Sequence, residues 1–268
     1  MLKAVEKGDK DFVEFCRRDV FGTRISCLYN CYSTDYDFVK FWKQTDYDGN
    51  IISAVSRIDG DATLTSTGEN AEEIHAFLQI VGFCTVQCEK RIAELMGAES
   101  SLEGYVVEYI KNKNEIKEIQ ADNIFRPKEI YDIIKSAKLV GVGDYLPWLS
   151  DTTFRINRGV TSALSAVEDG KTVACAMKLF STETAVLLGA VATRPEYRGR
   201  GLAGALVTRL AESEKNKRVE LLCKHDSIVE FYKSIGFEVN NEWSIITDEN
   251  EFFQVSEKVS SAADKALE

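Results

Sequence analysis

A glycine-rich turn at residues 198–201 carries the most chemically specific pattern in the chain. It reads Arg-Gly-Arg-Gly and stands between an apolar strand expected over Ala185–Thr193 and a helix expected over 202–215. Glycine lets a backbone pass close to a ligand, and the free N–H groups and positive dipole end of a helix N-terminus favour an anion. The order of strand, glycine turn and helix therefore predicts a phosphate cradle.

Two other interpretations of this turn compete with a general phosphate cradle. Residues 199–204 fit the dinucleotide pattern G-x-G-x-x-G, and Glu220 follows about twenty residues later. In a dinucleotide-binding turn, however, the first glycine follows its strand almost directly, whereas five residues separate them here. This spacing disfavours an NAD site, and a turn with only a structural role is the remaining alternative.

The stretch 191–203 resembles the acetyl-CoA pyrophosphate loop of GCN5-related N-acetyltransferases (GNAT). The pattern of that loop, [Q/R]-x-x-G-x-[G/A], is met by Arg198, Gly201 and Ala203. Residues 225–237 resemble the family's late helix and following strand, in which a tyrosine, here Tyr232, precedes a Gly-Phe pair by four residues.

A third block, 154–163, resembles the helix-to-strand passage of one GNAT branch. The resemblance covers roughly residues 128–247, and the first half of the chain lacks any [Q/R]-x-x-G-x-[G/A] sequence. It implies an enzyme that transfers the acetyl group of acetyl-CoA to a primary amine, expected to be that of a small molecule. The residues that it assigns to the cofactor are Val191, Thr193, Arg198, Gly199, Arg200, Gly201, Leu202 and Ala203.

The resemblance makes Tyr232 the general acid, because a phenol can protonate a leaving thiolate. A packing role is the other interpretation of this tyrosine. A backbone N–H near Val191 is the expected donor to the oxyanion. The general base is not identified: the strand Ala185–Thr193 has no carboxylate, Glu183 and Glu220 are expected at the surface, and a water chain is equally compatible.

The acceptor pocket is expected between the region 140–158 and the edge of the strand. Its candidate residues are Tyr145, Trp148 and Asp151, in a stretch that Gly141, Gly143 and Pro147 mark as irregular. Asp151 suits either an ammonium group or a helix N-cap. The alternative to catalysis is an acyl-CoA-binding regulatory module, favoured by the missing carboxylate.

The expected fold class is α+β, with two tandem GNAT-like domains, each a mostly antiparallel mixed sheet flanked by helices. Both halves show the order helix, antiparallel strands, helix, strand, helix, strand. The polar run 111–122 is the best linker candidate. The predicted domains are 1–125, a degenerate copy without a CoA loop, 126–257, which binds acetyl-CoA, and a disordered tail at 258–268.

Composition agrees with a soluble protein of 268 residues, 44% hydrophobic and 28% charged. The first 125 residues hold 14 Lys and Arg against 22 Asp and Glu, which argues against nucleic-acid binding there. With no apolar run near 18 residues and no apolar start, neither a membrane nor export is expected, and the predicted location is cytoplasmic. The chain is expected to be a monomer or a homodimer.

The seven cysteines include two C-x-x-x-C pairs, Cys27/Cys31 and Cys84/Cys88, which can indicate zinc. The same spacing places two small apolar residues on one helix face, and the chain has only 2 histidines. Reduced, buried thiols and no metal are therefore expected.

Overall fold

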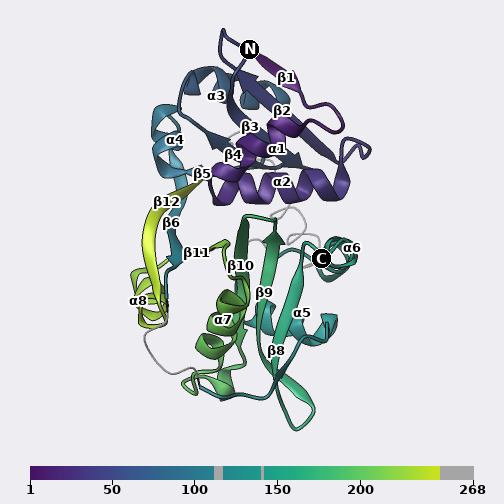
Figure 1. Cartoon of the computed structure of the whole chain (residues 1–268), viewed down its shortest axis with the longest axis vertical. Coiled ribbons are helices and arrows are strands. Elements are labelled where there is room, and N and C mark those ends of the chain that lie inside the picture. Colours follow the sequence, from purple (N-terminus) through teal and green to yellow (C-terminus); the bar gives the residue numbers. More distant parts are fainter. Residues whose placement is uncertain (112–116, 140–141, 248–268) are drawn as a thin grey trace, which may run out of the picture. The chain divides into compact units, whose positions relative to one another are not determined.

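The computed structural model describes residues 1–111, 117–139 and 142–247, and the predicted tail at 258–268 lies outside them. Contacts divide the chain into two compact units. Unit 1 is Met1–Glu103 with the chain from Glu242 onward, and unit 2 is Gly104–Asn241 (Figure 1).

Unit 1 is a mixed sheet with helices. Its elements are β1 (Leu2–Ala4), α1 (Lys10–Phe15), the 3₁₀ turn η1 (Cys16–Arg18), α2 (Val20–Tyr32), β2 (Val39–Thr45), β3 (Ile51–Ile58), β4 (Asp61–Ser66), α3 (Ala71–Val81), β5 (Thr85–Glu89) and α4 (Lys90–Leu95). Neighbouring strands are antiparallel except β4 and β5, which α3 connects in parallel.

Unit 2 repeats this order. Its elements are β7 (Ala121–Asp122), α5 (Pro127–Ser136), α6 (Tyr145–Asn157), β8 (Ser162–Glu168), β9 (Lys171–Ser181), β10 (Ala185–Thr193), η2 (Pro195–Tyr197), α7 (Leu202–Ser213), β11 (Arg218–Cys223) and α8 (Asp226–Ser234). Only β10 and β11 are parallel among its described strand pairs. The predicted class, α+β with mostly antiparallel mixed strands flanked by helices, is confirmed.

Two long strands pass from one unit into the other. β6 (Ser100–Tyr109) places its residues 105–108 against β11 in unit 2, and β12 (Phe237–Thr247) places its residues 243–247 against β5 in unit 1. The division by contacts therefore falls at 103/104 and 241/242, whereas the sequence suggested a linker over 111–122 and a domain boundary at 125/126. Each half of the chain supplies a strand to the other half's sheet.

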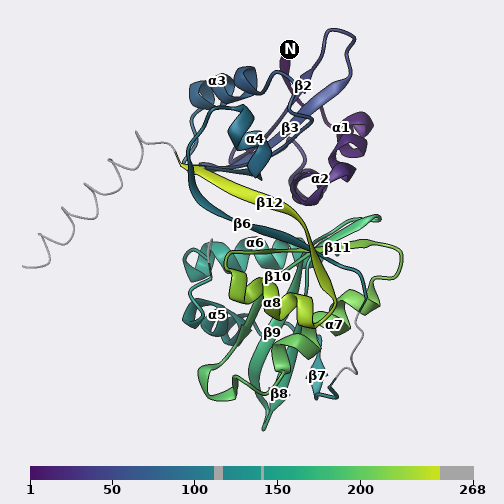
Figure 2. The same ribbon diagram turned by 90° about the vertical axis from the view of Figure 1, so that its left-hand side faces the viewer.

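The two faces of the unit 2 sheet carry different helices (Figure 2). Ala174 and Ala176 of β9 face the cluster formed with α7 and α8, whereas the alternating Cys175 and Met177 face the cluster of α5 isoleucines. β10 thus lies between two packed layers, with its C-terminal end directed at the glycine turn.

Candidate active site

The glycine turn has the conformation of an anion cradle. Gly199 and Gly201 have φ of 73° and 75°, in the left-handed region that side chains disfavour. A Cβ at Gly199 would meet nothing within 4 Å, so this glycine is required for its conformation and not for space. Gly201 is the N-cap of α7, and no side chain in the described chain caps the helix there. The first-turn N–H groups therefore remain available to a ligand.

Among the residues assigned to cofactor binding, Leu202 is the one whose side chain is buried in the core. It is 5% exposed and belongs to the cluster under α7, so it can offer a ligand only its N–H. The side chain of Ala203 is half-buried, while Arg198, Gly199, Arg200 and Gly201 are exposed. The cradle therefore offers main-chain donors framed by two arginines.

Three arginines near the turn have different partners. Arg194 Nε donates to the carbonyl of Thr172 at 2.8 Å, which joins the end of β10 to β9. Arg200 Nη2 lies 2.8 Å from Glu168 Oε1, which offsets part of its charge. Arg198 Nε donates at 3.2 Å to Thr193 O beside the turn.

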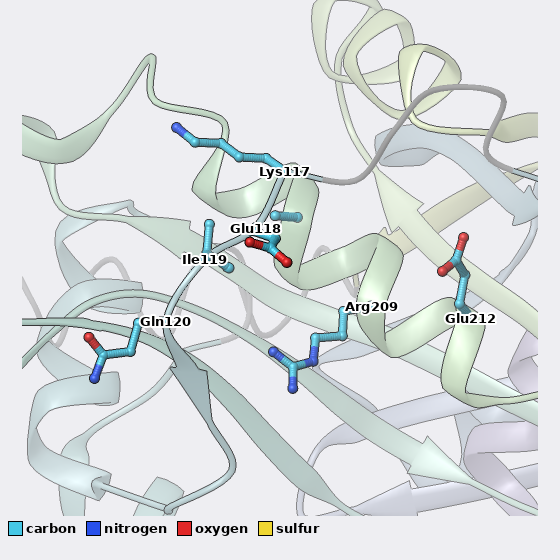
Figure 3. Close-up of a pocket in the computed structure, with 7 residues that line it drawn as sticks. Lys117, Glu118, Ile119, Gln120, Arg209 and Glu212 are labelled. Atoms are coloured by element: carbon cyan, nitrogen blue, oxygen red, sulfur yellow. The ribbon is translucent and has the colours of Figure 1, made fainter.

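Lys117 supplies a further cation that the sequence did not indicate. Its Nζ donates to the carbonyl of Arg200 at 2.7 Å, although 83 residues separate the two. Lys117 also lines a groove of about 600 Å³ along α7 (Figure 3), whose lining residues are Lys117, Glu118, Ile119, Gln120, Ala205, Arg209 and Glu212. Both signs of charge line this groove, so Lys117 matters chiefly for its place beside the turn.

The parallel strands part above the cradle. Their ladder joins Ala185–Leu188 to Arg218–Leu221, and β10 then continues to Thr193 while β11 ends at Cys223. Val191 and Thr193 lie in this last stretch and are half-buried. An opened edge of this kind can pair with an extended ligand in the manner of an added strand.

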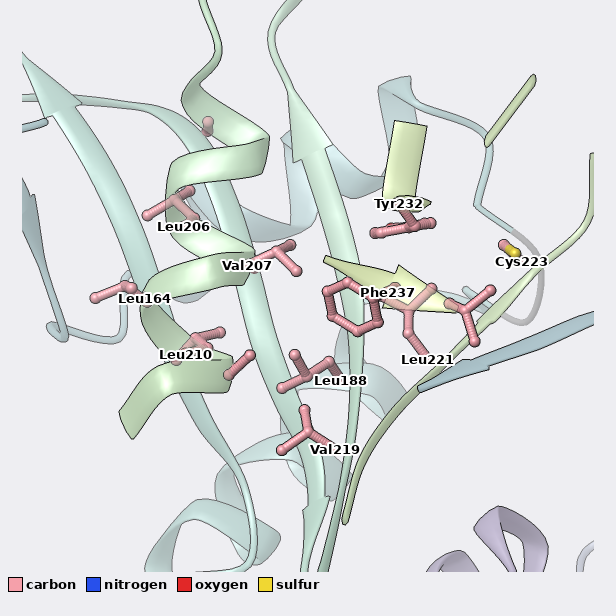
Figure 4. Packing of buried hydrophobic residues seen from close by; sticks show 14 of the residues in the cluster. Leu164, Leu188, Leu206, Val207, Leu210, Val219, Leu221, Cys223, Tyr232 and Phe237 are labelled. Atoms are coloured by element: carbon pink, nitrogen blue, oxygen red, sulfur yellow. The ribbon is translucent and has the colours of Figure 1, made fainter. Parts of the chain in front are cut away.

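Tyr232 lies in the apolar cluster on the α7 and α8 face. Its ring centroid is 5.5 Å from that of Phe237, and Val191 packs against the same cluster (Figure 4). Burial, with a smaller effect from the nearby Cys223, raises the pKa of its hydroxyl above the ordinary value. The phenol therefore keeps its proton at neutral pH, as a donor must, although a raised pKa also makes it a weaker acid.

Glu220 was expected at the surface, but the structure buries it, with 3% of the residue exposed. One carboxylate oxygen accepts from Arg218 Nε at 2.8 Å and the other from Asn240 Nδ2 at 3.4 Å. Burial raises its pKa, and Arg218 opposes that effect. With both oxygens engaged by β11 and β12, Glu220 ties strands together, whereas Glu183 is exposed as expected.

Tyr145 and Trp148 belong to an aromatic group between α5 and α6. Their rings stack at 6.3 Å, and both lie near the Tyr131 ring, at 5.0 and 5.3 Å. Trp148 and Ala190 of β10 pack against the same α5 cluster. The structure therefore brings the Trp148 side of α6 toward β10.

Asp151 lies inside α6 and is not its N-cap, which is Asp144. Its carboxylate accepts from Arg155 Nε at 3.0 Å and from Arg155 Nη2 at 2.6 Å. Arg155 is 7% exposed and also donates to the carbonyl of Leu179, so the pair anchors α6 to β9. The carboxylate of Asp151 already has a cationic partner, which weakens its case as an ammonium ligand.

All seven cysteines are free thiols, and only Cys84 is not buried. Within the described residues no group of three or more His, Cys, Asp or Glu side chains is placed to hold a metal ion. No helix in the described ranges is both long enough and apolar enough to cross a bilayer.

Comparison with known proteins gives the site a family. Residues 161–239 match the family model of the acetyltransferase (GNAT) domain. No curated protein matches the sequence.

Several solved structures resemble the whole chain in fold. A tandem GNAT protein from the clavulanic acid biosynthesis pathway aligns with a TM-score of 0.58 and 13% identity, over 92% of this chain and 98% of its own. A GNAT-family acetyltransferase from Colwellia psychrerythraea gives 0.57 and 12%, over 92% and 100%. A GCN5-related N-acetyltransferase from Sphaerobacter thermophilus gives 0.56 and 15%, over 91% and 94%.

These similarities extend across both units, including the first, which lacks the loop sequence. Residues 161–239 hold β8 to β11, the glycine turn and Tyr232, so the matched model covers the cradle and the parting strands. Residues 161–239 therefore carry a domain that matches the GNAT acetyltransferase model, and the chain as a whole has the fold seen in a tandem GNAT protein.

Proposed function

We propose that the protein is an acetyl-CoA-dependent N-acetyltransferase that acts on the primary amine of a small molecule. The observation that carries the proposal is the uncapped N-terminus of α7 behind two left-handed glycines, placed where β10 and β11 part. This combination offers one end of a ligand a phosphate site and the other end an extended strand edge.

Each part of the site has a role in this proposal. The main-chain N–H groups of residues 199–203 hold the pyrophosphate of CoA, helped by Arg198, Arg200 and Lys117. The main chain of Val191 and Thr193 pairs with the pantetheine arm. Acetyl-CoA supplies the acetyl group as a thioester.

The chemical roles fall to two groups on β10 and α8. The Val191 N–H donates to the carbonyl oxygen of the thioester as negative charge develops there. The amine nitrogen attacks the thioester carbon directly and the C–S bond breaks. The hydroxyl of Tyr232 gives its proton to the leaving sulfur and regains one from solvent. Because β10 has no carboxylate and Glu220 is engaged by Arg218 and Asn240, we propose that the amine loses its proton through solvent.

A panel of primary amines tests the activity directly. Release of free thiol from acetyl-CoA in the presence of one amine, matched by a mass increase of one acetyl group on that amine, supports the proposal. Micromolar binding of acetyl-CoA without transfer to any amine, peptide or protein lysine would instead support the acyl-CoA-binding module. The absence of a carboxylate from β10 favours that alternative.

Tyr232→Phe is expected to lower kcat about 100-fold, the usual scale for losing a positioned proton donor. The Kd of acetyl-CoA should stay within about twofold, because the ring and its packing remain. Tyr109→Phe is the matched control, since Tyr109 packs on the same cluster but its hydroxyl donates to the exposed Glu212. Turnover in the Tyr232→Phe protein equal to that of the wild type contradicts the acid role.

Lys117→Met is expected to raise the Kd of CoA about two- to fivefold at low salt, the effect of one exposed charge near a phosphate site. The difference should shrink as salt is added, because exposed charges are screened. Titration calorimetry at two salt concentrations measures it, with Lys3→Met in unit 1 as the control. A difference that does not change with salt would show that Lys117 acts otherwise than by charge.

A further inference from the structure

The last part of β10 contains a bulge. Gly189 pairs with Met177 of β9 and Ala192 pairs with Cys175, so three steps along β10 match two along β9. Ala190, inside the bulge, has φ of 49°, a conformation that a residue with a side chain disfavours. Such a conformation persists only where its surroundings hold it.

The sulfur of Cys175 lies under this bulge and contacts it on both sides of Val191. Its S–H donates to the carbonyl of Ala190, with Sγ and O 3.4 Å apart, and the N–H of Ala192 acts on the same sulfur in the direction that lowers the pKa of the thiol. Cys175 is completely buried, and burial raises the pKa of its thiol to about 12. The S–H donor is therefore present throughout the neutral pH range.

The neighbouring residues shape the bulge from the same side. A Cβ at Gly189 would lie 2.4 Å from Leu179 Cδ1, so this glycine lets Leu179 pack beneath β10. Leu179 and Ala190 pack against the α5 cluster that includes Cys175, whereas Val191 packs against the opposite cluster, which holds Tyr232.

The peptide group between Ala190 and Val191 connects the Cys175 thiol to the Val191 N–H, the proposed oxyanion donor. A trans peptide is planar, with its C=O and N–H pointing in opposite directions, and the described chain has no cis bond. A thiol that holds the Ala190 carbonyl on the α5 side consequently holds the Val191 N–H toward the other side. That side is the one on which Tyr232 lies.

We infer that Cys175 is a positioning residue. Its thiol holds the Ala190 carbonyl in the bulge and thereby orients the Val191 N–H toward the thioester carbonyl. The inference rests on the proposed acetyl transfer. It assigns a buried cysteine that touches no substrate to the orientation of the oxyanion donor. The thiol undergoes no chemistry of its own.

Cys175→Ala is expected to lower kcat about tenfold, a fraction of the loss that follows removal of an oxyanion donor, while the Kd of acetyl-CoA stays within about twofold. Cys175→Ser keeps a donor at this position and should recover kcat to within about threefold of the wild type. Cys88→Ala removes an equally buried thiol from unit 1 and should leave kcat unchanged.

Ala190→Gly tests the same bulge without touching the cysteine. Glycine adopts this φ without strain and the thiol still holds the carbonyl, so the loss in kcat should be smaller than that of Cys175→Ala, at constant Kd. Unchanged kcat in Cys175→Ala, or equal losses in the Ala and Ser variants, would overturn the inference while leaving an active wild type. A wild type that neither binds acetyl-CoA nor transfers its acetyl group would instead overturn the proposed function.

Discussion

Gly201→Glu is expected to raise the Kd of CoA at least about 100-fold, which corresponds to about 2.7 kcal/mol. Three effects act together. The φ of 75° is unfavourable for any side chain, the new side chain competes for the space before α7, and its carboxylate takes the helix N-terminus that the pyrophosphate needs. Titration calorimetry with CoA measures the change.

Two variants separate the ligand effect from backbone strain. Gly201→Ala keeps the strain without the charge and should cost far less affinity than Glu. Gly97→Glu places the same side chain at a left-handed glycine of unit 1, with φ of 64° and open space around it, and should leave the Kd unchanged. A folded Gly201→Glu protein that binds CoA with wild-type affinity would contradict the cradle assignment.

The elements that could be predicted from the sequence have both a clear hydrophobic pattern and flanking residues that mark where the element ends. The strand Ala185–Thr193 has the predicted bounds, because it is a continuous apolar run followed by a proline turn. In the same way, an amphipathic pattern between Asn70 and Gly82 predicts a helix over 71–81, and α3 has these bounds. Local signals were sufficient there.

Two helices could not be predicted because their local signals conflict. α2 is buried on nearly all sides, so its apolar residues show no 3.6-residue period, and Gly22 stands in its first turn because a Cβ would meet Cys16 O at 2.1 Å. α6 begins beside Gly143 and contains Pro147, which suggested an irregular loop. A proline in the first turn is compatible with a helix, and Arg155 then anchors that helix through contacts distant in sequence.

The candidate site divides in the same way. The glycine turn and Tyr232 lie in continuous motifs, so the sequence alone was enough to propose them. Lys117 and Cys175 act through residues 83 and 15 positions away, and nothing in their own neighbourhoods marks them. Such contacts depend on strand order, which the sequence leaves open.

Removal of β6 is expected to abolish the folding of unit 2, although β6 precedes the boundary that the sequence suggested. A fragment of residues 104–241 should unfold in one cooperative thermal transition, whereas residues 117–241 should show none. Residues 105–108 of β6 pair with 220–223 of β11, and Val106 and Val107 are 1% and 0% exposed. Burying two valines contributes roughly 3–6 kcal/mol, and the lost ladder adds about 1 kcal/mol for each hydrogen bond.

The sum of these losses is comparable with the whole stability of an ordinary domain, about 5–15 kcal/mol. Loss of β6 also turns β11 into an exposed edge, a template for aggregation. Circular dichroism melting and size-exclusion chromatography of the two fragments measure the difference, and a fragment that starts at residue 126 should behave like the one that starts at 117. A cooperative transition in the 117–241 fragment would show that β6 is dispensable and that the boundary near 125 marks an independent folding unit.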